Sequence, residues 1–207
     1  MAIPTDADVV QKMVEPWVGQ HRPEIQPSGC APLTRIPAID DVLNDHATAL
    51  QDDFLGYRNH VYRIVNLCVV IAGRPSDLEK IAVAAVFHDL GIWANGTFDY
   101  IAPSIALAHE YLVARAHEDW IAEIEGMIAD HHKITRSTAG PDSLIEAFRR
   151  ADWIDVTRGM RSFGVPRPFI AKLFAMWPDA GFHWRLVTLT LDRFRRHPLT
   201  PLPMVKL

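Results

Sequence analysis

The 207-residue sequence predicts an all-α fold, and three observations support that prediction. From Ile39 onward, apolar residues recur at helical spacing rather than in the alternating pattern of strands. Proline and glycine interrupt this pattern at intervals of about 15–25 residues, as expected between helices of ordinary length. Hydrophobic residues make up 49% of the chain and charged residues 22%, which is enough apolar surface for one buried core.

The first 37 residues differ from the rest because prolines interrupt them too often for a long helix or a paired strand. These prolines are Pro4, Pro16, Pro23, Pro27, Pro32 and Pro37. Apolar side chains such as Val9 and Trp17 would anchor the segment. We therefore expect an irregular arm, residues 1–37, packed on a helical domain, residues 38–207.

The periodic segments predict helices at about 38–50, 53–72, 76–90, 103–115, 118–132, 141–158, 166–176 and 182–196. Ser76 and Glu79 have the spacing of a capping box at the start of the third helix. Gly91 stands where a helix would end in a left-handed residue. Pro103 and Pro141 suit first-turn positions, where an amide has no intrahelical partner.

Composition and charge exclude several functional classes. The formal net charge is −4 and no block of Lys or Arg is present, which argues against a nucleic-acid surface. No stretch reaches the ~20 apolar residues of a membrane span. The chain opens without a secretory signal pattern and has only Cys30 and Cys68, so a disulfide framework is not expected. We expect a cytoplasmic protein with a small-molecule substrate, and a homodimer is compatible with the sequence.

Ten histidines are the unusual feature of the composition. His60 shares a helical face with Tyr57, Ile64 and Leu67, so its side chain is expected to point into the core. A single inward histidine is more often an ordinary core residue than a ligand. His88 and Asp89, however, end a strongly apolar helix side by side, where both can reach one ion.

Later segments add further inward polar groups. His131 ends an apolar stripe of the helix at 118–132, and His132 follows it. Asp152 and Asp155 interrupt the apolar face of the helix at 141–158. A buried carboxylate needs a cation, a metal or several hydrogen bonds, and for Asp152 an ion pair with Arg63 or Arg158 is as reasonable as metal ligation.

The order His, His-Asp, His, Asp over helical segments resembles the HD-domain superfamily of metal-dependent hydrolases. The matching stretches are Asn59-His60, Phe87-His88-Asp89-Leu90-Gly91 and Ala151-Asp152-Trp153-Ile154-Asp155. The resemblance implies an HD-domain-like helical bundle in which one divalent metal is held by His60, His88, Asp89 and Asp152. Mixed imidazole and carboxylate ligands suit Zn, Mn, Fe or Ni. Such an ion lowers the pKa of a bound water and polarises an ester or nitrile-like substrate.

Several branches of that superfamily are disfavoured by the residues after the His-Asp pair. Ile92 and Trp93 stand where the 5′-deoxynucleotidase and guanosine tetraphosphate hydrolase branches carry acidic residues. The HHExxDGxGYP pattern of cyclic-di-GMP phosphodiesterases is absent. A loose similarity to cyanamide hydratase-type proteins covers 88–91, 104–112 and 128–131.

The sequence thus predicts a metal-dependent hydrolase that acts on a small metabolite. Phosphohydrolase is the first choice of activity, and the metabolite need not carry a phosphate group. The alternatives are a cyanamide hydratase-like lyase, a diiron oxygenase and a non-catalytic regulatory module. Predicted catalytic residues are His131, Lys133 and Asp155, with Lys133 and Arg158 as substrate-binding cations. An additional metal would use His109, His131 or His132, although mid-helix His109 is expected not to bind the first ion.

Overall fold

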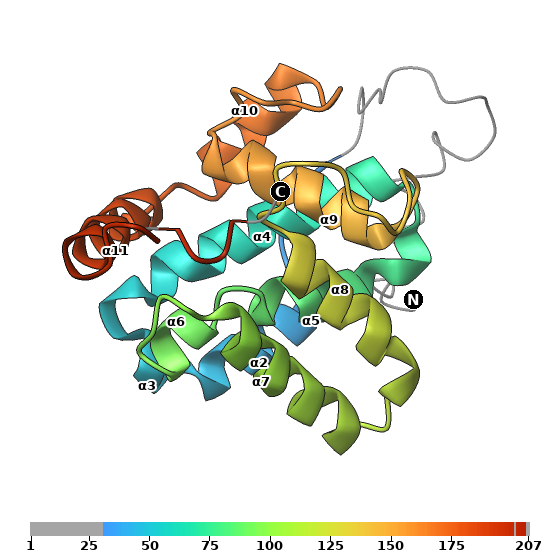
Figure 1. Ribbon diagram of the computed structural model, residues 1–207. Helices are drawn as coiled ribbons and strands as arrows, with labels where there is room; N and C mark the ends of the chain where they lie inside the picture. The colour runs from blue at the N-terminus through green and yellow to red at the C-terminus, as the bar shows by residue number, and fades with distance from the viewer. Residues whose placement is uncertain (1–30, 201, 206–207) are drawn as a thin grey trace.

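A computed structural model describes residues 31–200 and 202–205, and these residues contain helices, turns and loops but no strand. The all-α prediction is therefore confirmed for the described part of the chain (Figure 1). The α-helices are α2 (Pro37–Asp45), α3 (Ala47–Leu50), α4 (Phe54–Ala72), α5 (Leu78–Phe87), α6 (Gly91–Ala94), α7 (Ile101–Ala114), α8 (Ile121–Asp130), α9 (Leu144–Val156), α10 (Arg167–Met176) and α11 (Phe182–Arg196). Short 3-10 turns occupy Gln51–Asp53, Pro75–Asp77 and Glu118–Trp120.

Helix α4 is the centre of the fold and contacts α2, α5 and α9 (Figure 1). It is buried along most of its 19 residues, because it is apolar on nearly every face from Val61 to Ile71. Gly73 ends it in the left-handed conformation, with φ of 62°, and its N–H donates to Val69 O. Helix α8 packs on α5, α7 and α9, so the carboxyl ends of α5 and α8 meet the middle of α4 and α9.

Two boundary predictions around α5 are wrong. Ser76 lies in a 3-10 turn, Asp77 precedes the first residue of α5, and no side chain of the described residues caps this helix end. Gly91 does not end a helix in a left-handed conformation but begins α6. Glycine is needed at this position for a steric reason, because a Cβ there would lie 2.7 Å from Tyr100 O and 2.9 Å from Ser104 Oγ. Gly91 is required for close contact between α6 and α7.

Capping occurs instead at α9, where Ser143 Oγ accepts a hydrogen bond from the Glu146 backbone N–H at 3.1 Å. Pro141 therefore lies before the helix rather than in its first turn, while Pro103 is the third residue of α7. The predicted helix at 118–132 is a 3-10 turn followed by α8, which ends at Asp130. That earlier end leaves His131 and His132 just beyond the helix.

The chain from residue 31 to α2 packs on α4. Leu33 and Ile36 are buried, Leu33 N–H donates to Asn66 Oδ1 at 2.7 Å, and Ile36 N–H donates to Tyr62 OH at 3.1 Å. The predicted packing of the arm over residues 1–30 lies outside the described residues.

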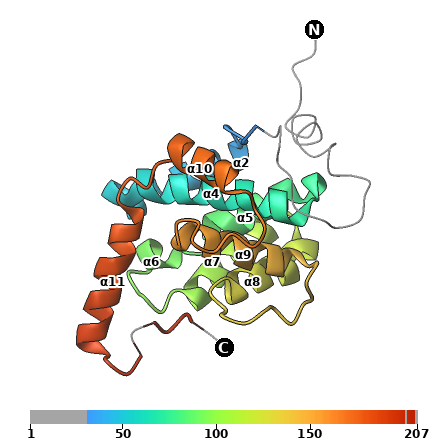
Figure 2. The same cartoon turned by 90° about the horizontal axis from the view of Figure 1, so that it is seen from above.

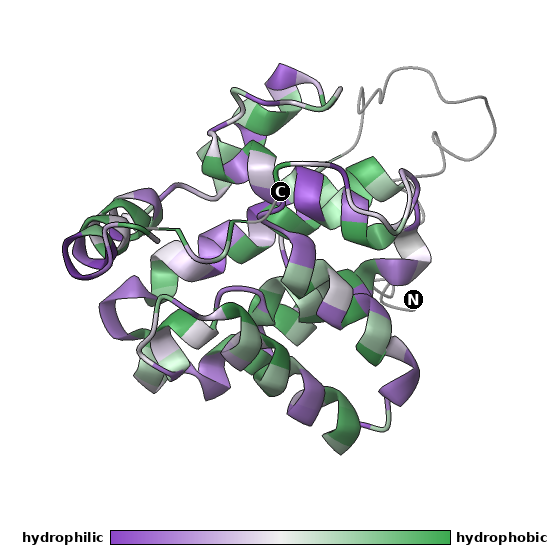
Figure 3. Cartoon of the chain, viewed as in Figure 1, coloured by the Kyte–Doolittle hydropathy of each residue, from purple (hydrophilic) through white to green (hydrophobic). Residues whose placement is uncertain are grey.

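Helix α11 stands at one edge of the bundle, beside the amino end of α4 (Figure 2). Its first residue, Phe182, is buried, whereas Trp184, Leu191 and Phe194 are exposed. Figure 3 shows hydrophobic and hydrophilic residues mixed along this helix. Among the described residues, no helix combines the length and apolar character needed to cross a bilayer.

Candidate metal centre

Three helical segments bring a cluster of imidazoles and carboxylates together in the core. His60 comes from the middle of α4, His88 and Asp89 follow α5, and Asp152 comes from α9. Each of these side chains is at most 3% exposed. The predicted metal ligands therefore lie together in the core, although they are distant in sequence.

The hydrogen bonds of the histidines determine which ring nitrogen is available to bind a metal ion. His88 Nδ1 donates to Ala85 O at 2.7 Å, and His60 Nδ1 donates to the Asp155 carboxylate at 2.6 Å. His131 Nδ1 likewise donates to Ile128 O at 2.7 Å. In the neutral tautomer each ring then keeps its lone pair on Nε2, the form that binds metals.

These free nitrogens face the carboxylates and one another. His60 Nε2 and His88 Nε2 are 3.0 Å apart. Asp89 Oδ2 lies 3.4 Å from His88 Nε2 and 3.8 Å from His60 Nε2, and Asp152 Oδ1 lies 4.0 Å from both. Two nitrogens bound to one ion at ~2.0–2.1 Å are roughly 3 Å apart, so the geometry fits a common ion.

A second group of side chains shares Asp89. Its Oδ1 lies 3.3 Å from His131 Nε2, and His132 completes this group. His132 Nδ1 lies 3.2 Å from Asp152 Oδ2. Each of the two carboxylates thus directs one oxygen toward the His60–His88 pair and the other toward the His131–His132 pair.

Three of these four carboxylate oxygens form no regular hydrogen bond within the described part of the chain, although imidazole nitrogens lie near two of them. Asp89 Oδ1 and both oxygens of Asp152 are buried and form no hydrogen bond of normal geometry with described residues. Burying an ionised carboxylate without compensation costs several kcal/mol. Asp152 does not form the alternative ion pair with Arg63 or Arg158, because both guanidiniums bind other carboxylates. These oxygens therefore favour a bound cation over an ion pair with either arginine.

The ionisation of the cluster favours the same interpretation. Burial opposes ionisation of Asp89, but His88, His131 and His132 outweigh it and hold its pKa well below the usual range. The pKa of Asp152 is also lowered, since His132 and the neighbouring imidazoles outweigh burial. Burial lowers the pKa of both His60 and His88, which favours their neutral, metal-binding form.

Asp155 lies behind His60 rather than inside the cluster. Besides His60 Nδ1, its carboxylate accepts from Arg63, with Oδ2 3.0 Å from Nη2 and Oδ1 in contact with Nε. Arg63 also donates to Trp177 O at 2.7 Å. The His60 ring stacks on Phe182, with centroids 4.0 Å apart. These contacts fix the His60 ring, so Asp155 is a positioning residue.

Sequence reasoning missed two residues at the centre. Tyr100, just before α7, is buried and its hydroxyl lies 2.8 Å from His132 Nε2 and 3.5 Å from His131 Nε2. Nothing in its sequence context marks it, because it lies in the loop before the helix. Arg63 is expected from the sequence only as a possible partner of Asp152. It lies three residues after His60 on the same helix, so the two side chains are neighbours on the helix surface.

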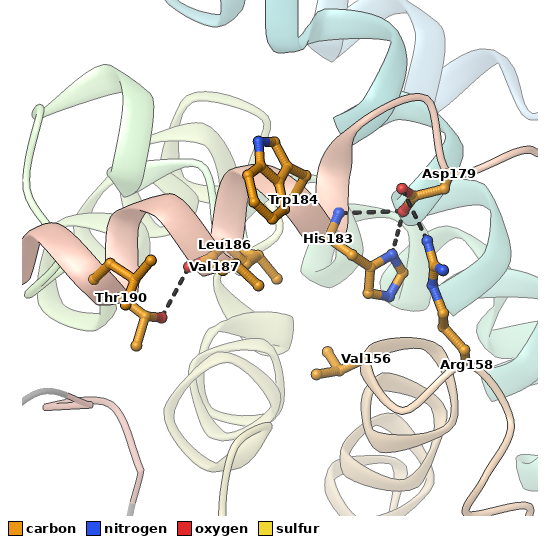
Figure 4. A pocket seen from close by; sticks show the side chains of 9 residues that line it. Val156, Arg158, Asp179, His183, Trp184, Leu186, Val187 and Thr190 are labelled. Carbon is orange, nitrogen blue, oxygen red and sulfur yellow. Dashed lines mark hydrogen bonds and ion pairs between the residues drawn. The ribbon is translucent and has the colours of Figure 1, made fainter.

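The remaining predicted residues lie outside the cluster. His109 is half exposed on α7 and bonds to Glu125 Oε1 at 2.9 Å. Lys133 follows His132, but its Nζ lies 3.9 Å from Asp130. Arg158 has 60% of its side chain exposed and pairs with Asp179 at 3.1 Å. Arg158 lines a pocket of about 550 Å³ beside α11. Figure 4 shows it next to Asp179 and His183.

No protein-family model matches the chain, and no significant match was found among curated proteins or among solved structures. The assignment of a metal centre therefore rests on the buried His/Asp cluster itself.

Proposed function

We propose that this protein is a metal-dependent hydrolase of the HD superfamily that acts on a small metabolite. The observation that carries the proposal is the convergence of two buried carboxylates, Asp89 and Asp152, with the free Nε2 atoms of His60 and His88. A divalent ion held by these four residues would lower the pKa of water and polarise a substrate oxygen or nitrogen.

The two neighbouring histidines, His131 and His132, would have further roles beside that ion. His132, with 16% of its side chain exposed, is the most accessible imidazole of the cluster. The Asp152 carboxylate outweighs burial and raises the pKa of His132. The Tyr100 hydroxyl forms a 2.8 Å hydrogen bond with Nε2, the other nitrogen of this ring. His132 is thereby poised to hold or release a proton beside the carboxylates, while buried His131 is positioned as a base or ligand.

A substrate panel tests this proposal. Phosphate monoesters, carboxylic esters and cyanamide are incubated with the purified chain in the presence of Zn, Mn, Fe or Ni. We expect turnover of one class that requires the metal and is abolished by Asp152→Asn, whereas His109→Ala retains it. Activity that persists in Asp152→Asn would contradict the proposal. Turnover of cyanamide alone would identify the hydratase branch.

A dinuclear oxygenase is the second candidate, because Asp89 presents its two carboxylate oxygens to different histidine pairs. A shared carboxylate of this kind is suited to two neighbouring ions. His109 does not supply the second ligand set, whereas His131 and His132 are placed to do so. Iron at about two ions per chain with consumption of O₂ would favour this candidate.

A further inference from the structure

A basic pocket lies beside the metal centre and contains none of the proposed ligands. It has a volume of about 380 Å³ and is lined by side chains of α9, of the segment after His132 and of the loop before α10. The charged lining residues are Arg136, Glu146, Arg149, Arg150 and Arg161. Four guanidiniums facing one carboxylate leave a net charge of +3 in a small concave space.

Glu146 neutralises only part of this charge. Arg149 binds it at two points, Nε to Oε2 and Nη2 to Oε1, both at 2.8 Å. Arg150 Nε donates to Oε1 at 2.8 Å. Burial works against ionisation of Glu146, but the arginines and the Ser137 N–H outweigh it and lower its pKa to about 2. The carboxylate is therefore fully ionised and already saturated with donors.

The other guanidiniums remain available. Arg136 and Arg161 form no ion pair within the described part of the chain, and both are exposed at the pocket. The Arg161 guanidinium lies over the Trp153 ring, 4.7 Å from its centroid, which holds it in place without neutralising it. Arg150 uses only Nε for Glu146, so its terminal nitrogens have no partner among the described residues. Preorganised donors of this kind match the oxygens of a phosphate group.

One residue that lines the pocket has an unusual backbone conformation. Phe163 lines the pocket with φ of 47°, a left-handed conformation that non-glycine residues rarely adopt. Its ring lies 5.6 Å from the Arg149 guanidinium. Strained residues of this kind cluster at binding sites, where the surrounding contacts hold them.

We propose that this pocket binds a dianion of the phosphate class, either free or as the phosphate group of a larger metabolite. The anion would bridge Arg136, Arg150 and Arg161 while Arg149 and Glu146 form the floor. The floor also contacts the segment that follows His132. Arg149 Nη1 donates to Lys133 O at 3.1 Å, and Trp153 Nε1 donates to the same oxygen at 3.1 Å. Lys133 directly follows His131 and His132. The inference does not depend on the proposed hydrolase activity, because none of the proposed metal ligands lines the pocket.

Calorimetric titration of the full chain with inorganic phosphate and with phenyl phosphate, at ionic strength held constant with chloride, tests the proposal. We expect saturable binding of at least one of the two anions, weakened by about tenfold or more in the double variant Arg136→Gln/Arg161→Gln. Both side chains are exposed, so this variant should keep the wild-type melting temperature. Tighter binding of phenyl phosphate would identify a phosphorylated metabolite, and tighter binding of inorganic phosphate the free anion; both support the site.

Arg195→Gln is the matched control, because Arg195 is exposed on α11 and pairs only with Asp192 among described residues. It should bind both anions as the wild type does. Absence of binding at millimolar anion, or equal weakening in the control, would overturn the proposal. Wild-type affinity in the double variant would also overturn it, since the anion would then bind elsewhere, for example at the metal centre.

Discussion

His60 and Asp155 form a buried 2.6 Å hydrogen bond that links the candidate metal centre to the Arg63 guanidinium. The bond fixes the His60 tautomer, so that Nε2 rather than Nδ1 faces Asp89, Asp152 and His88. Burial works against the charge of Asp155, but Arg63 and His60 outweigh it and hold its pKa well below the usual range. A carboxylate that orients a metal-binding histidine in this way commonly raises its ligand strength.

Replacing Asp155 by Asn should therefore weaken metal binding without removing a ligand. We expect an affinity loss of about 10–100-fold, as for other carboxylates behind ligating histidines. The measurement is a competition titration against a metallochromic chelator. The matched control is Asp192→Asn, which removes an exposed carboxylate on α11. An unchanged metal affinity in Asp155→Asn would mean that this hydrogen bond does not position His60.

His109→Ala should leave the bound metal per chain unchanged. The imidazole is half exposed and bonds to Glu125 on the neighbouring helix, outside both groups of candidate ligands. A small effect on stability, about 0–1 kcal/mol, is expected from loss of a surface pair. Elemental analysis of the variant provides the check. Loss of one equivalent of metal would show that α7 contributes to a second ion.

The stability contributed by Glu146 should disappear in acid. Its pKa falls from 4.5 in the unfolded chain to about 2 in the folded chain, so its contribution is complete above pH 4.5 and is lost as pH falls toward 2. At neutral pH, Glu146→Gln should destabilise the fold by about 3 kcal/mol, because Arg149 is left buried without its partner. Urea unfolding of both proteins between about pH 7 and pH 3 should show this difference shrinking. A difference that is independent of pH would contradict the assignment.

Gly91→Ala and Gly126→Ala should differ in stability. At Gly91 the added methyl group meets backbone, Tyr100 O at 2.7 Å, and the helices must separate at a cost of about 1–3 kcal/mol. At Gly126 it meets Ile145 Cδ1 at 2.5 Å, the end of a side chain that can rotate away. Alanine also favours a helix interior by ~1 kcal/mol, which offsets part of the second cost. Equal melting temperatures for the two variants would refute this comparison.

The fold class and much of the cluster could be predicted because they depend on periodicity. Asp152 interrupts an apolar stripe of α9, and His131 directly follows the apolar stripe of α8, so their inward direction follows from helical spacing. The identity of partners could not be predicted in the same way. Arg63 pairs with Asp155 instead of Asp152, a choice made by the crossing of α4 and α9 and by the carbonyl of Trp177.

Local boundaries were less predictable, because the competing signals differ by only a few residues. The Ser76 and Glu79 spacing fits a capping box, but Pro75–Asp77 forms a 3-10 turn, and a side-chain N-cap is found instead at Ser143, whose Oγ accepts from the Glu146 N–H. The role of Gly91 depends on the approach of α7, which is a tertiary contact that no local pattern reveals.

The metal content of the purified full chain tests the central claim most directly. After incubation with Zn, Mn, Fe or Ni and removal of free ions, we expect about one or two ions per chain in the wild type. Asp152→Asn and His88→Ala should each lose most of that metal, whereas His109→Ala keeps it. A wild-type chain that retains none of these ions, or ligand variants that retain as much as the wild type, would contradict a metal centre at His60, His88, Asp89 and Asp152.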